Sequence, residues 1–281
     1  MSEFRLCLRV ATLALALTPS AVLAQTAADA VPTITIIGST PFPGSGIDID
    51  KIPGAAQSIS AADLSREGSA DLIGAINNRI GSITINDNLS DQFQPDILFR
   101  GFEASPVLGT PQGLAVYQGG VRINEAFGDT VNWDLFPSAA IDRVDMVSSN
   151  PIYGLNALGG AVIVTMKNGF SFEGAEGEVS GGSFGQRSTT LQYGVNDGMF
   201  GFYIAGKVLD EDGWREFTKD ATRQLYSDFS IRNDRLTFDA SFTGANNRLF
   251  GQGRPNRCHD AAGNHNRHQS GWEKTHLLST R

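Results

Sequence analysis

The residues best suited to catalysis or metal binding lie near the C-terminus. Cys258 and His259 are adjacent, and His265, His268 and His276 follow within a short stretch. Thiolate and imidazole groups are zinc ligands, so loose metal binding is one interpretation of this stretch and an irregular tail is the other. No histidine precedes residue 259, which excludes a Ser-His-Asp or Cys-His arrangement in the rest of the chain. No glycine-rich phosphate loop follows a strand and opens a helix. We therefore predict that the protein is not an enzyme, with no metal site and no cofactor.

A second group of residues suits the binding of a small molecule. Long polar loops at 86–95, 102–113 and 124–137 carry aromatic and amide side chains. Aromatic rings can stack on an apolar ligand, and amides can exchange hydrogen bonds with it. The candidates are Phe93, Gln94, Gln112, Phe127, Asn132 and Trp133. The alternative is that these side chains pack the loops against neighbouring structure.

The N-terminus predicts export from the cytoplasm. Arg5 and Arg9 precede the apolar run 10–17, and residues 22–24 (VLA) form a cleavage site, so residues 1–24 are interpreted as a signal peptide. The alternative, a transmembrane anchor, needs roughly 20 apolar residues, and this run is shorter. Cys7 leaves with the signal, so Cys258 alone remains and no internal disulfide is expected.

Composition limits the classes of partner. The chain has a net charge of −8 and is 41% hydrophobic and 19% charged. An acidic balance without a basic stripe argues against nucleic-acid binding. Taken alone, these values fit an exported soluble domain.

Residues 25–50 read as a tether that contains one β-prone run. The run, residues 33–37 (TITII), is too short to bury itself, so it is free to add as a strand to the sheet edge of a partner. A first strand of the folded domain, or a plain linker, is the alternative.

An α/β pattern follows from residue 60. Ser60 and Asp63 predict a capped helix, and a second helix carries Leu72, Ile73, Ile76 and Ile80 at helical spacing before Gly81 stops it. Short strands are predicted at 83–85, 97–100, 114–117, 121–123, 141–147 and 161–167. Gly119 and Gly120 form the two-residue turn of a hairpin.

After Lys167 the hydrophobic period changes from helical to two. Strands of roughly ten residues, apolar on one face and polar on the other, are predicted at 176–184, 189–195, 200–208, 224–231 and 235–243. This is the pattern of a transmembrane β-barrel wall, but a soluble antiparallel sheet shows the same alternation. Residues 254–281 show no alternation.

Five blocks, in the right order, resemble the TonB-dependent outer-membrane receptors. They are residues 52–59 (IPGAAQSI), 97–102 (ILFRGF), 115–122 (AVYQGGVR), 141–145 (IDRVD) and 153–167 (YGLNALGGAVIVTMK). The resemblance covers about residues 31–245 and is densest between 52 and 167. It implies an α+β plug domain followed by antiparallel β-strands of an incomplete transmembrane β-barrel.

The resemblance also implies roles for particular residues. Thr33, Ile34, Thr35, Ile36 and Ile37 would be the TonB box that the inner-membrane energy transducer pulls by strand addition. Arg100, Arg143 and Lys167 would place positive charge near carboxylates of the barrel wall. Gly101, Gly119, Gly120, Gly154, Gly159 and Gly160 would allow tight turns and close backbone approach. Residues 148–150 (SSN) stand where the family commonly has Arg-Gly, so one basic anchor is absent.

The chain is short for a complete receptor of this class. We expect a signal peptide at 1–24, a TonB-box tether at 25–50, a plug at 51–168, the first barrel strands at 169–250 and an irregular, out-of-frame or unrelated tail at 251–281. Four or five strands leave open sheet edges whose backbone N–H and C=O groups find no hydrogen-bond partner in lipid. This predicts a truncated or frameshifted receptor. Two functions follow: a receptor fragment for TonB-coupled uptake of a ferric chelate or similar nutrient across the outer membrane, or a soluble periplasmic plug that binds TonB or ligand without transport. A non-functional product is the third reading.

Overall fold

The computed structural model describes residues 36–38, 46–52, 54–66, 72–89, 91–148, 151–213, 219–233, 236–250 and 272–278. The chain divides into residues 1–34, which lie outside the described residues, and one compact unit from residue 35 onward. Within that unit we distinguish an α/β region, residues 46–169, from the long-strand sheet that follows it.

The two predicted helices of the α/β region are confirmed. α1 (Ala61–Arg66) begins after Ser60, whose Oγ accepts the Asp63 amide at 3.3 Å while Asp63 Oδ2 accepts the Ser60 amide at 3.4 Å. This reciprocal pair satisfies two amides at the start of the helix. α2 (Leu72–Arg79) buries Leu72, Ile73 and Ile76, as its spacing predicts.

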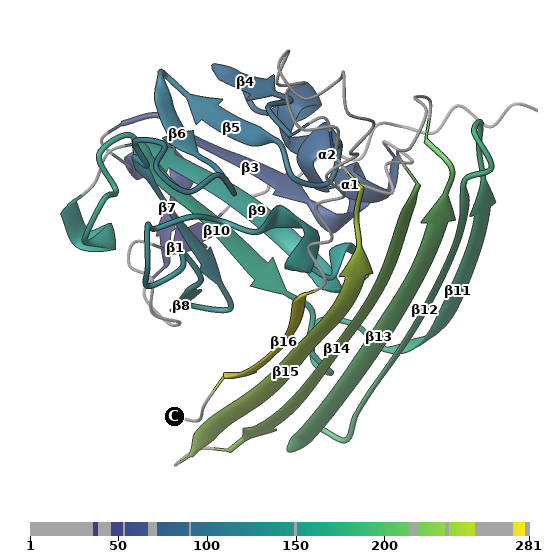
Figure 1. Cartoon of the computed structure of the whole chain (residues 1–281). Coiled ribbons are helices and arrows are strands. Elements are labelled where there is room, and N and C mark those ends of the chain that lie inside the picture. The colour runs from purple at the N-terminus through teal and green to yellow at the C-terminus, as the bar shows by residue number, and fades with distance from the viewer. Residues whose placement is uncertain are drawn as a thin grey trace, which may run out of the picture. The chain divides into compact units, whose positions relative to one another are not determined.

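A five-stranded mixed sheet forms the centre of the α/β region. Its order is β3 (Ala56–Ser60), β9 (Ile141–Ser148), β10 (Gly160–Met166), β7 (Leu114–Gln118) and β8 (Val121–Arg122). β10 pairs in parallel with β7 and antiparallel with β9, and Figure 1 shows these strands side by side. Gly119 and Gly120, with φ of 55° and 84°, turn the chain from β7 into β8.

Smaller elements surround this sheet. β4 (Ile83–Asn86), β5 (Asp96–Phe99) and β6 (Phe102–Ala104) form a second sheet, and β1 (Ile36–Gly38) pairs with β2 (Gly46–Asp48). Single 3₁₀ turns lie at η1 (Ile49–Lys51), η2 (Trp133–Leu135), η3 (Ser138–Ala140) and η4 (Pro151–Tyr153). β3 and β6 were not among the strands expected from local sequence pattern.

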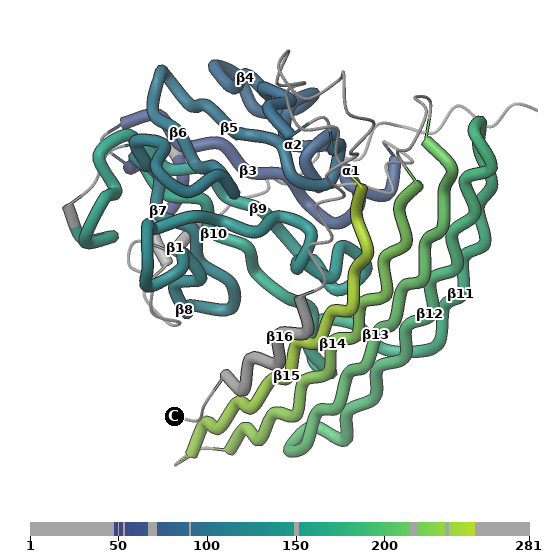
Figure 2. The backbone as a smooth tube through the Cα atoms, in the orientation of Figure 1, coloured from purple at the N-terminus to yellow at the C-terminus, as the bar shows by residue number. Residues whose placement is uncertain are grey.

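The long-strand sheet is antiparallel, follows chain order and is not closed. Its strands are β11 (Gly174–Gly181), β12 (Arg187–Asn196), β13 (Phe200–Glu211), β14 (Asp220–Arg232), β15 (Thr237–Arg248) and β16 (Trp272–Leu278). Figure 2 traces β11–β15 as adjacent, roughly aligned strands. β16 pairs with β15 and lies within residues 251–281, the stretch for which the sequence predicts an irregular tail.

Burial in the long-strand sheet is the reverse of that in a soluble sheet. On one face of β13 the charged side chains of Lys207 and Glu211 are buried together with Tyr203. On the other face the apolar side chains of Phe202 and Val208 are exposed. The same holds in β14, where Asp228 is buried and Phe229 is 40% exposed. A soluble sheet turns its apolar face inward, so this orientation favours the barrel-wall interpretation.

The outward positions of β12–β15 lie in register across the strands and are mostly apolar; we call them the belt. Cross-strand register aligns Leu191, Gly206, Leu225 and Gly244; then Tyr193, Ile204, Ser227 and Phe242; then Val195, Phe202, Phe229 and Ala240. From Phe200 to Val208 the belt extends about 26 Å along the strand at ~3.3 Å per residue. That height is comparable with the roughly 25 Å apolar band of outer-membrane barrels.

Asp134, in η2, joins the α/β region to the inward face of the long-strand sheet. Asn247 Nδ2 of β15 donates to its carbonyl oxygen at 2.8 Å and its Oδ2 at 2.9 Å, and Gln224 Nε2 of β14 donates to the same carbonyl at 2.7 Å. Gln94 Nε2 reaches the Asp134 Oδ1 at 2.7 Å. The buried carboxylate is therefore satisfied by neutral amides from both regions.

Further polar contacts extend this seam, by which we mean the contacts between the α/β region and the inward face of the long-strand sheet. Lys207 Nζ donates to Ser138 Oγ at 2.8 Å, and Gln118 Nε2 donates to Thr243 Oγ1 at 2.9 Å. Tyr203 and Tyr226 lie among the buried side chains of the α/β core with ring centroids 6.1 Å apart. The two regions thus share one core edged by hydrogen bonds.

In the described part of the chain, no helix is both long and apolar enough to cross a membrane.

Substitution of Gly160 tests the close packing of β9 and β10. A Cβ at Gly160 would lie 2.2 Å from the Val147 carbonyl oxygen, and φ is 150°. We expect Gly160→Ala to lower the free energy of unfolding by at least about 2 kcal/mol. Gly181→Ala is the matched control, because its Cβ would lie 3.8 Å from the nearest atom. The measurement is the urea midpoint of the full chain in detergent; equal midpoints for the two variants would contradict this account.

Removal of the Asp134 carboxylate tests the seam. Asp134→Ala leaves the Gln94 and Asn247 amides without an acceptor that they use here, at a cost of about 1–3 kcal/mol for each buried donor. We expect a lower urea midpoint for Asp134→Ala than for Glu173→Ala, which removes an exposed carboxylate. A midpoint unchanged from the parent chain would show that the amides are satisfied elsewhere.

Candidate functional site

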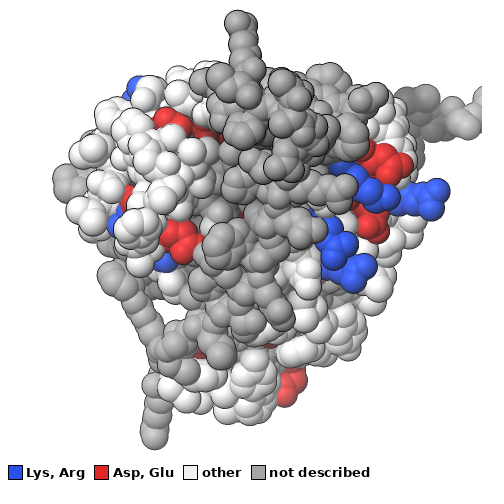
Figure 3. Space-filling view, in the orientation of Figure 1, with Lys and Arg blue, Asp and Glu red and all other residues white. Residues whose placement is uncertain are grey.

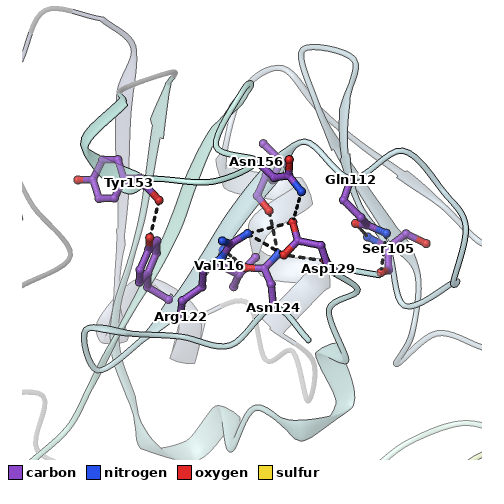
Figure 4. A network of polar contacts seen from close by, with 10 residues as sticks. Ser105, Gln112, Val116, Arg122, Asn124, Asp129, Tyr153 and Asn156 are labelled. Atoms are coloured by element: carbon purple, nitrogen blue, oxygen red, sulfur yellow. Dashed lines mark hydrogen bonds and ion pairs between the residues drawn. The ribbon is translucent and has the colours of Figure 1, made fainter. Parts of the chain in front are cut away.

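A polar pocket of about 530 Å³ opens between β8, the loop that follows it and the loop after η4. The lining residues are Thr110, Gln112, Arg122, Asn124, Glu125, Ala126, Gly128, Asp129, Leu155 and Asn156. Arg122 is the only lysine or arginine in this set. Figure 4 shows the side chains of Arg122, Asn124, Asp129 and Asn156 converging at its centre.

Arg122 and Asp129 form an ion pair in which one guanidinium nitrogen contacts both carboxylate oxygens. Arg122 Nη2 lies 2.7 Å from Asp129 Oδ1 and 2.9 Å from Oδ2, and both side chains are only partly exposed. Asn156 Nδ2 donates to the same Asp129 carboxylate at 2.7 Å. The guanidinium and the carboxylate are therefore held against each other in a fixed geometry.

Asn124 ties this pair to the central sheet. Its Oδ1 accepts the Val116 amide at 2.8 Å and Arg122 Nε at 3.2 Å, and its Nδ2 donates to the Leu114 carbonyl at 3.1 Å. Because β7 is fully buried, the pocket floor is anchored on a rigid element.

Two residues of the pocket adopt left-handed backbone conformations. Asp129 has φ of 56° and Asn156 has φ of 58°, values that few non-glycine residues take and that Asn and Asp tolerate best. Such conformations are frequent at binding sites, where surrounding contacts hold them. Here the Asn156–Asp129 hydrogen bond joins the two positions.

The rest of the network fixes the neighbouring loops. Gln112 Oε1 accepts the Ser105 amide at 2.9 Å, and Gln112 Nε2 donates to Thr110 Oγ1 at 2.7 Å. Tyr117 OH donates to the Tyr153 carbonyl at 2.5 Å (Figure 4). Burial raises the pKa of Tyr153 to about 12, so the hydroxyl stays protonated at neutral pH.

Apolar side chains stand beside the polar pocket. Leu155 lines it and is 75% exposed, and Phe127, between the lining residues Ala126 and Gly128, is 79% exposed. Leu108 lies against Gly128, where a Cβ would approach it to 2.2 Å. Exposed rings and branched chains beside a hydrogen-bonding floor suit a ligand with an apolar body and a polar group.

The residues predicted to bind a ligand separate into two sets. Gln112 lines the pocket, Asn132 donates to the lining residue Glu125 at 3.0 Å, and Phe127 stands at the rim. In contrast, Phe93 packs on Leu209 and Leu249 of the long-strand sheet region.

Gln94 and Trp133 are buried as well. Gln94 holds Asp134, and Trp133 is 3% exposed with its ring stacked on Phe136 at 5.8 Å. In this arrangement their side chains, like that of Phe93, are covered by protein, as the packing alternative had it.

The three predicted basic contacts differ in position. Lys167 Nζ reaches β12 through Gln192 Oε1 at 2.9 Å, and burial lowers the pKa of Lys167. Arg143 pairs with Asp145 of its own strand at 3.0 Å; burial raises the pKa of that carboxyl, while hydrogen bonding by Ser58 opposes the change. Arg100 is exposed in the turn between β5 and β6, with its guanidinium 5.2 Å from the Phe99 ring. Lys167 donates to an amide oxygen of the long-strand sheet, and the nearby Glu176 carboxylate of β11 opposes the lowering of its pKa by burial.

The predicted glycines occupy turns and close contacts. Positive φ values occur at Gly101, Gly119, Gly120, Gly154 and Gly160. Gly159 is needed for a different reason, since a Cβ there would lie 2.3 Å from the Phe102 side chain.

The predicted TonB box is only partly described. Ile36 and Ile37 belong to β1, which pairs with β2 through Ile36 opposite Asp48, and Thr33, Ile34 and Thr35 lie outside the described residues. Cys258, His259, His265 and His268 also lie outside them. Where the structure is described, no group of three His, Cys, Asp or Glu side chains could hold a metal ion.

The residues at the heart of the pocket were missed by the sequence analysis. No single one of them stands out in the sequence: Arg122 ends a short strand, and Asn124, Asp129 and Asn156 lie in polar loops. One usable signal was the placement of Asn124 and Asp129 just after a two-residue hairpin turn, where short polar side chains often bond to nearby backbone. The involvement of Asn156 depends on a long-range contact that local sequence does not encode.

On the face shown in Figure 3, the acidic and basic side chains of described residues lie in small mixed groups rather than in one basic field.

Comparison with known proteins is consistent with the fold. The model of the TonB-dependent Receptor Plug Domain family matches residues 48–161. No curated protein matches the chain.

Solved structures resemble the chain over about three quarters of its length. The closed form of the ferric-catecholate import receptor Fiu from Escherichia coli is 14% identical with a TM-score of 0.60, covering 77% of this chain and 29% of that one. The ferric preacinetobactin receptor BauA from Acinetobacter baumannii is 14% identical with a TM-score of 0.58, covering 73% and 30%. The pyoverdine outer-membrane receptor FpvA from Pseudomonas aeruginosa is 13% identical with a TM-score of 0.57, covering 73% and 29%.

The chain therefore spans less than a third of these three receptors, over the part in which both of its regions lie. Its α/β region corresponds to a plug, and its open antiparallel sheet corresponds to part of a barrel wall. Residues 48–161 match the plug domain of TonB-dependent receptors, and the fold of the chain resembles the plug and part of the barrel wall of such receptors.

Proposed function

We propose that the protein acts in TonB-coupled uptake of a ferric chelate or similar large nutrient across the outer membrane. The plug would bind the chelate at the pocket on Arg122 and Asp129 and release it when TonB pulls on the N-terminal segment. The observation that carries this proposal is the reversed burial of the long-strand sheet. Its apolar face is turned outward for lipid, while its polar face holds the plug.

The seam suits a plug that must move. Its polar contacts are hydrogen bonds from amides, a lysine and a hydroxyl, several of them to main-chain carbonyls of residues 134 and 139. Each contributes only about 0.5–1.5 kcal/mol net, because water can replace a broken hydrogen bond. A pulling force can therefore break the hydrogen bonds of the seam one at a time.

The N-terminal segment supplies a site for that force. β1 belongs to a two-stranded ribbon, so one of its edges is unpaired within the described residues and can accept a further strand. A two-stranded ribbon is also marginal in stability, so the segment can separate from β2 at low cost.

Cell fractionation tests the membrane part of the proposal. The full chain, expressed with its N-terminal segment, should sediment with the outer membrane and require detergent for extraction, because the belt on β12–β15 is apolar. The matched variant Leu225→Arg places a charge in that belt and should reduce insertion; a midplane arginine costs about 2–4 kcal/mol in such barrels. Recovery of the parent chain as a soluble periplasmic protein would instead support a plug that binds without transport.

A proline in β1 tests the TonB interaction. Ile36→Pro removes a backbone N–H and should weaken binding of the isolated periplasmic domain of TonB to the full chain by about tenfold or more. Ile36→Val, which keeps the N–H and the β-branched shape, should bind as the parent chain does. Calorimetry in detergent is the measurement, and equal affinity of the proline variant would remove residues 33–37 from the proposed interaction.

A further inference from the structure

The guanidinium of Arg122 in the pocket is already bonded to neighbouring side chains. Both oxygens of Asp129 contact Arg122 Nη2, and Asn124 accepts from Arg122 Nε, so an approaching anion finds the guanidinium occupied on two of its nitrogens. An anion could take Nη2 only if Arg122 left Asp129, which would leave that partly buried carboxylate with the hydrogen bond from Asn156 and is costly. An anion that approached the third nitrogen, Nη1, would lie beside the Asp129 carboxylate and be repelled by it.

The pocket lining also carries more acid than base. Its ionisable residues are Arg122, Asp129 and Glu125. An anionic ligand would therefore meet two carboxylates, whereas an uncharged ligand would meet amide, hydroxyl and carboxylate groups able to form hydrogen bonds.

We propose that this pocket selects uncharged metal chelates with hydrogen-bonding groups, of the ferric trihydroxamate class, over anionic chelates of the ferric tris-catecholate class. Three hydroxamates cancel the charge of Fe³⁺, whereas three catecholates leave a trianion. Asn156 Nδ2 gives one N–H to Asp129 and has a second N–H for a hydroxamate oxygen, and Leu155 and Phe127 offer apolar surface to the methylene chain of the chelate. This inference rests on the proposed function, because it names the substrate class of the same site.

The strained backbone supports a dedicated pocket rather than an incidental hollow. Asp129 and Asn156 both have left-handed φ values and are joined to each other, so the ion pair is presented in one geometry before any ligand arrives. Preorganisation of this kind reduces the entropy lost on binding.

The test compares two probes on the full chain in detergent by isothermal titration calorimetry. The probes are an uncharged ferric cyclic trihydroxamate and a trianionic ferric tris-catecholate. We expect the parent chain to bind the uncharged chelate at least about tenfold more tightly, a difference of about 1.4 kcal/mol. Equal or tighter binding of the trianion, or binding of neither probe, would overturn the inference.

An isosteric variant tests the cause. Asp129→Asn keeps the side-chain shape and tolerates the left-handed φ, but it releases Arg122. It should raise affinity for the trianion about tenfold, and so remove the preference of the parent chain for the uncharged chelate. Asp212→Asn, which breaks an exposed ion pair with Lys219 on the long-strand sheet, should change neither.

A double variant shows whether the gain in trianion affinity depends on the Arg122 guanidinium. In Asp129→Asn with Arg122→Gln, the gain in trianion affinity should disappear, since no cation is left to release. Persistence of the gain, or failure of Asp129→Asn to raise trianion affinity, would contradict the inference. Equal urea midpoints of the variants exclude unfolding as the cause.

The proposed function fails separately from this inference. If cells that make the full chain show no TonB-dependent uptake of either probe, transport is contradicted. The preference of the pocket for the uncharged chelate is judged separately, by calorimetry.

Discussion

The outward turn of the apolar face in the long-strand sheet is the constraint on which the rest of the structure depends. A sheet with its apolar side facing away from the protein must hold the α/β region by its polar side. The inward positions accordingly carry Tyr203, Lys207, Gln224 and Asn247, and their partners in the α/β region are Asp134, Ser138 and main-chain carbonyls. The two regions therefore meet through a satisfied polar seam, with tyrosines supplying most of the apolar contact. A purely apolar contact would have left the inward polar side chains buried without partners.

The same constraint explains why the pocket lies where it does. On the side of the α/β region that faces the long-strand sheet, polar side chains such as Gln94 and Asp134 are already hydrogen-bonded to protein groups. The loops around β8 and η4 lie on other elements, and there the polar side chains bond to one another and leave a cavity between them. The ion pair of Arg122 with Asp129 gives that cavity its fixed shape.

Elements with strong local signals were predictable from the sequence. The capped α1, the spacing of α2, the Gly119–Gly120 turn and the period-two strands all depend on residues close together in the chain. The strand β16 was not predictable, because its pairing with β15 is long-range and its sequence shows no alternation. The sequence also did not decide which face of the long-strand sheet is buried, because alternation of apolar and polar residues does not say which of the two faces points inward.

The site was predictable only where side-chain type and position agreed. Phe127 and Gln112 stand at the pocket because their loops are exposed, whereas Phe93 and Trp133 sit in equally polar loops and are buried by tertiary contacts. Lys167 reaches the long-strand sheet, but its partner is Gln192, which a search for carboxylates could not have found.

The use of main-chain carbonyls in the seam has a consequence for the evolution of such proteins. Gln224 and Asn247 both donate to the carbonyl of Asp134, and Tyr203 donates to that of Ala139. A carbonyl is present whatever side chain its residue carries, so these hydrogen bonds do not depend on which side chain stands at residue 134 or 139. At these contacts a substitution in the α/β region needs no compensating change in the long-strand sheet to keep the bond.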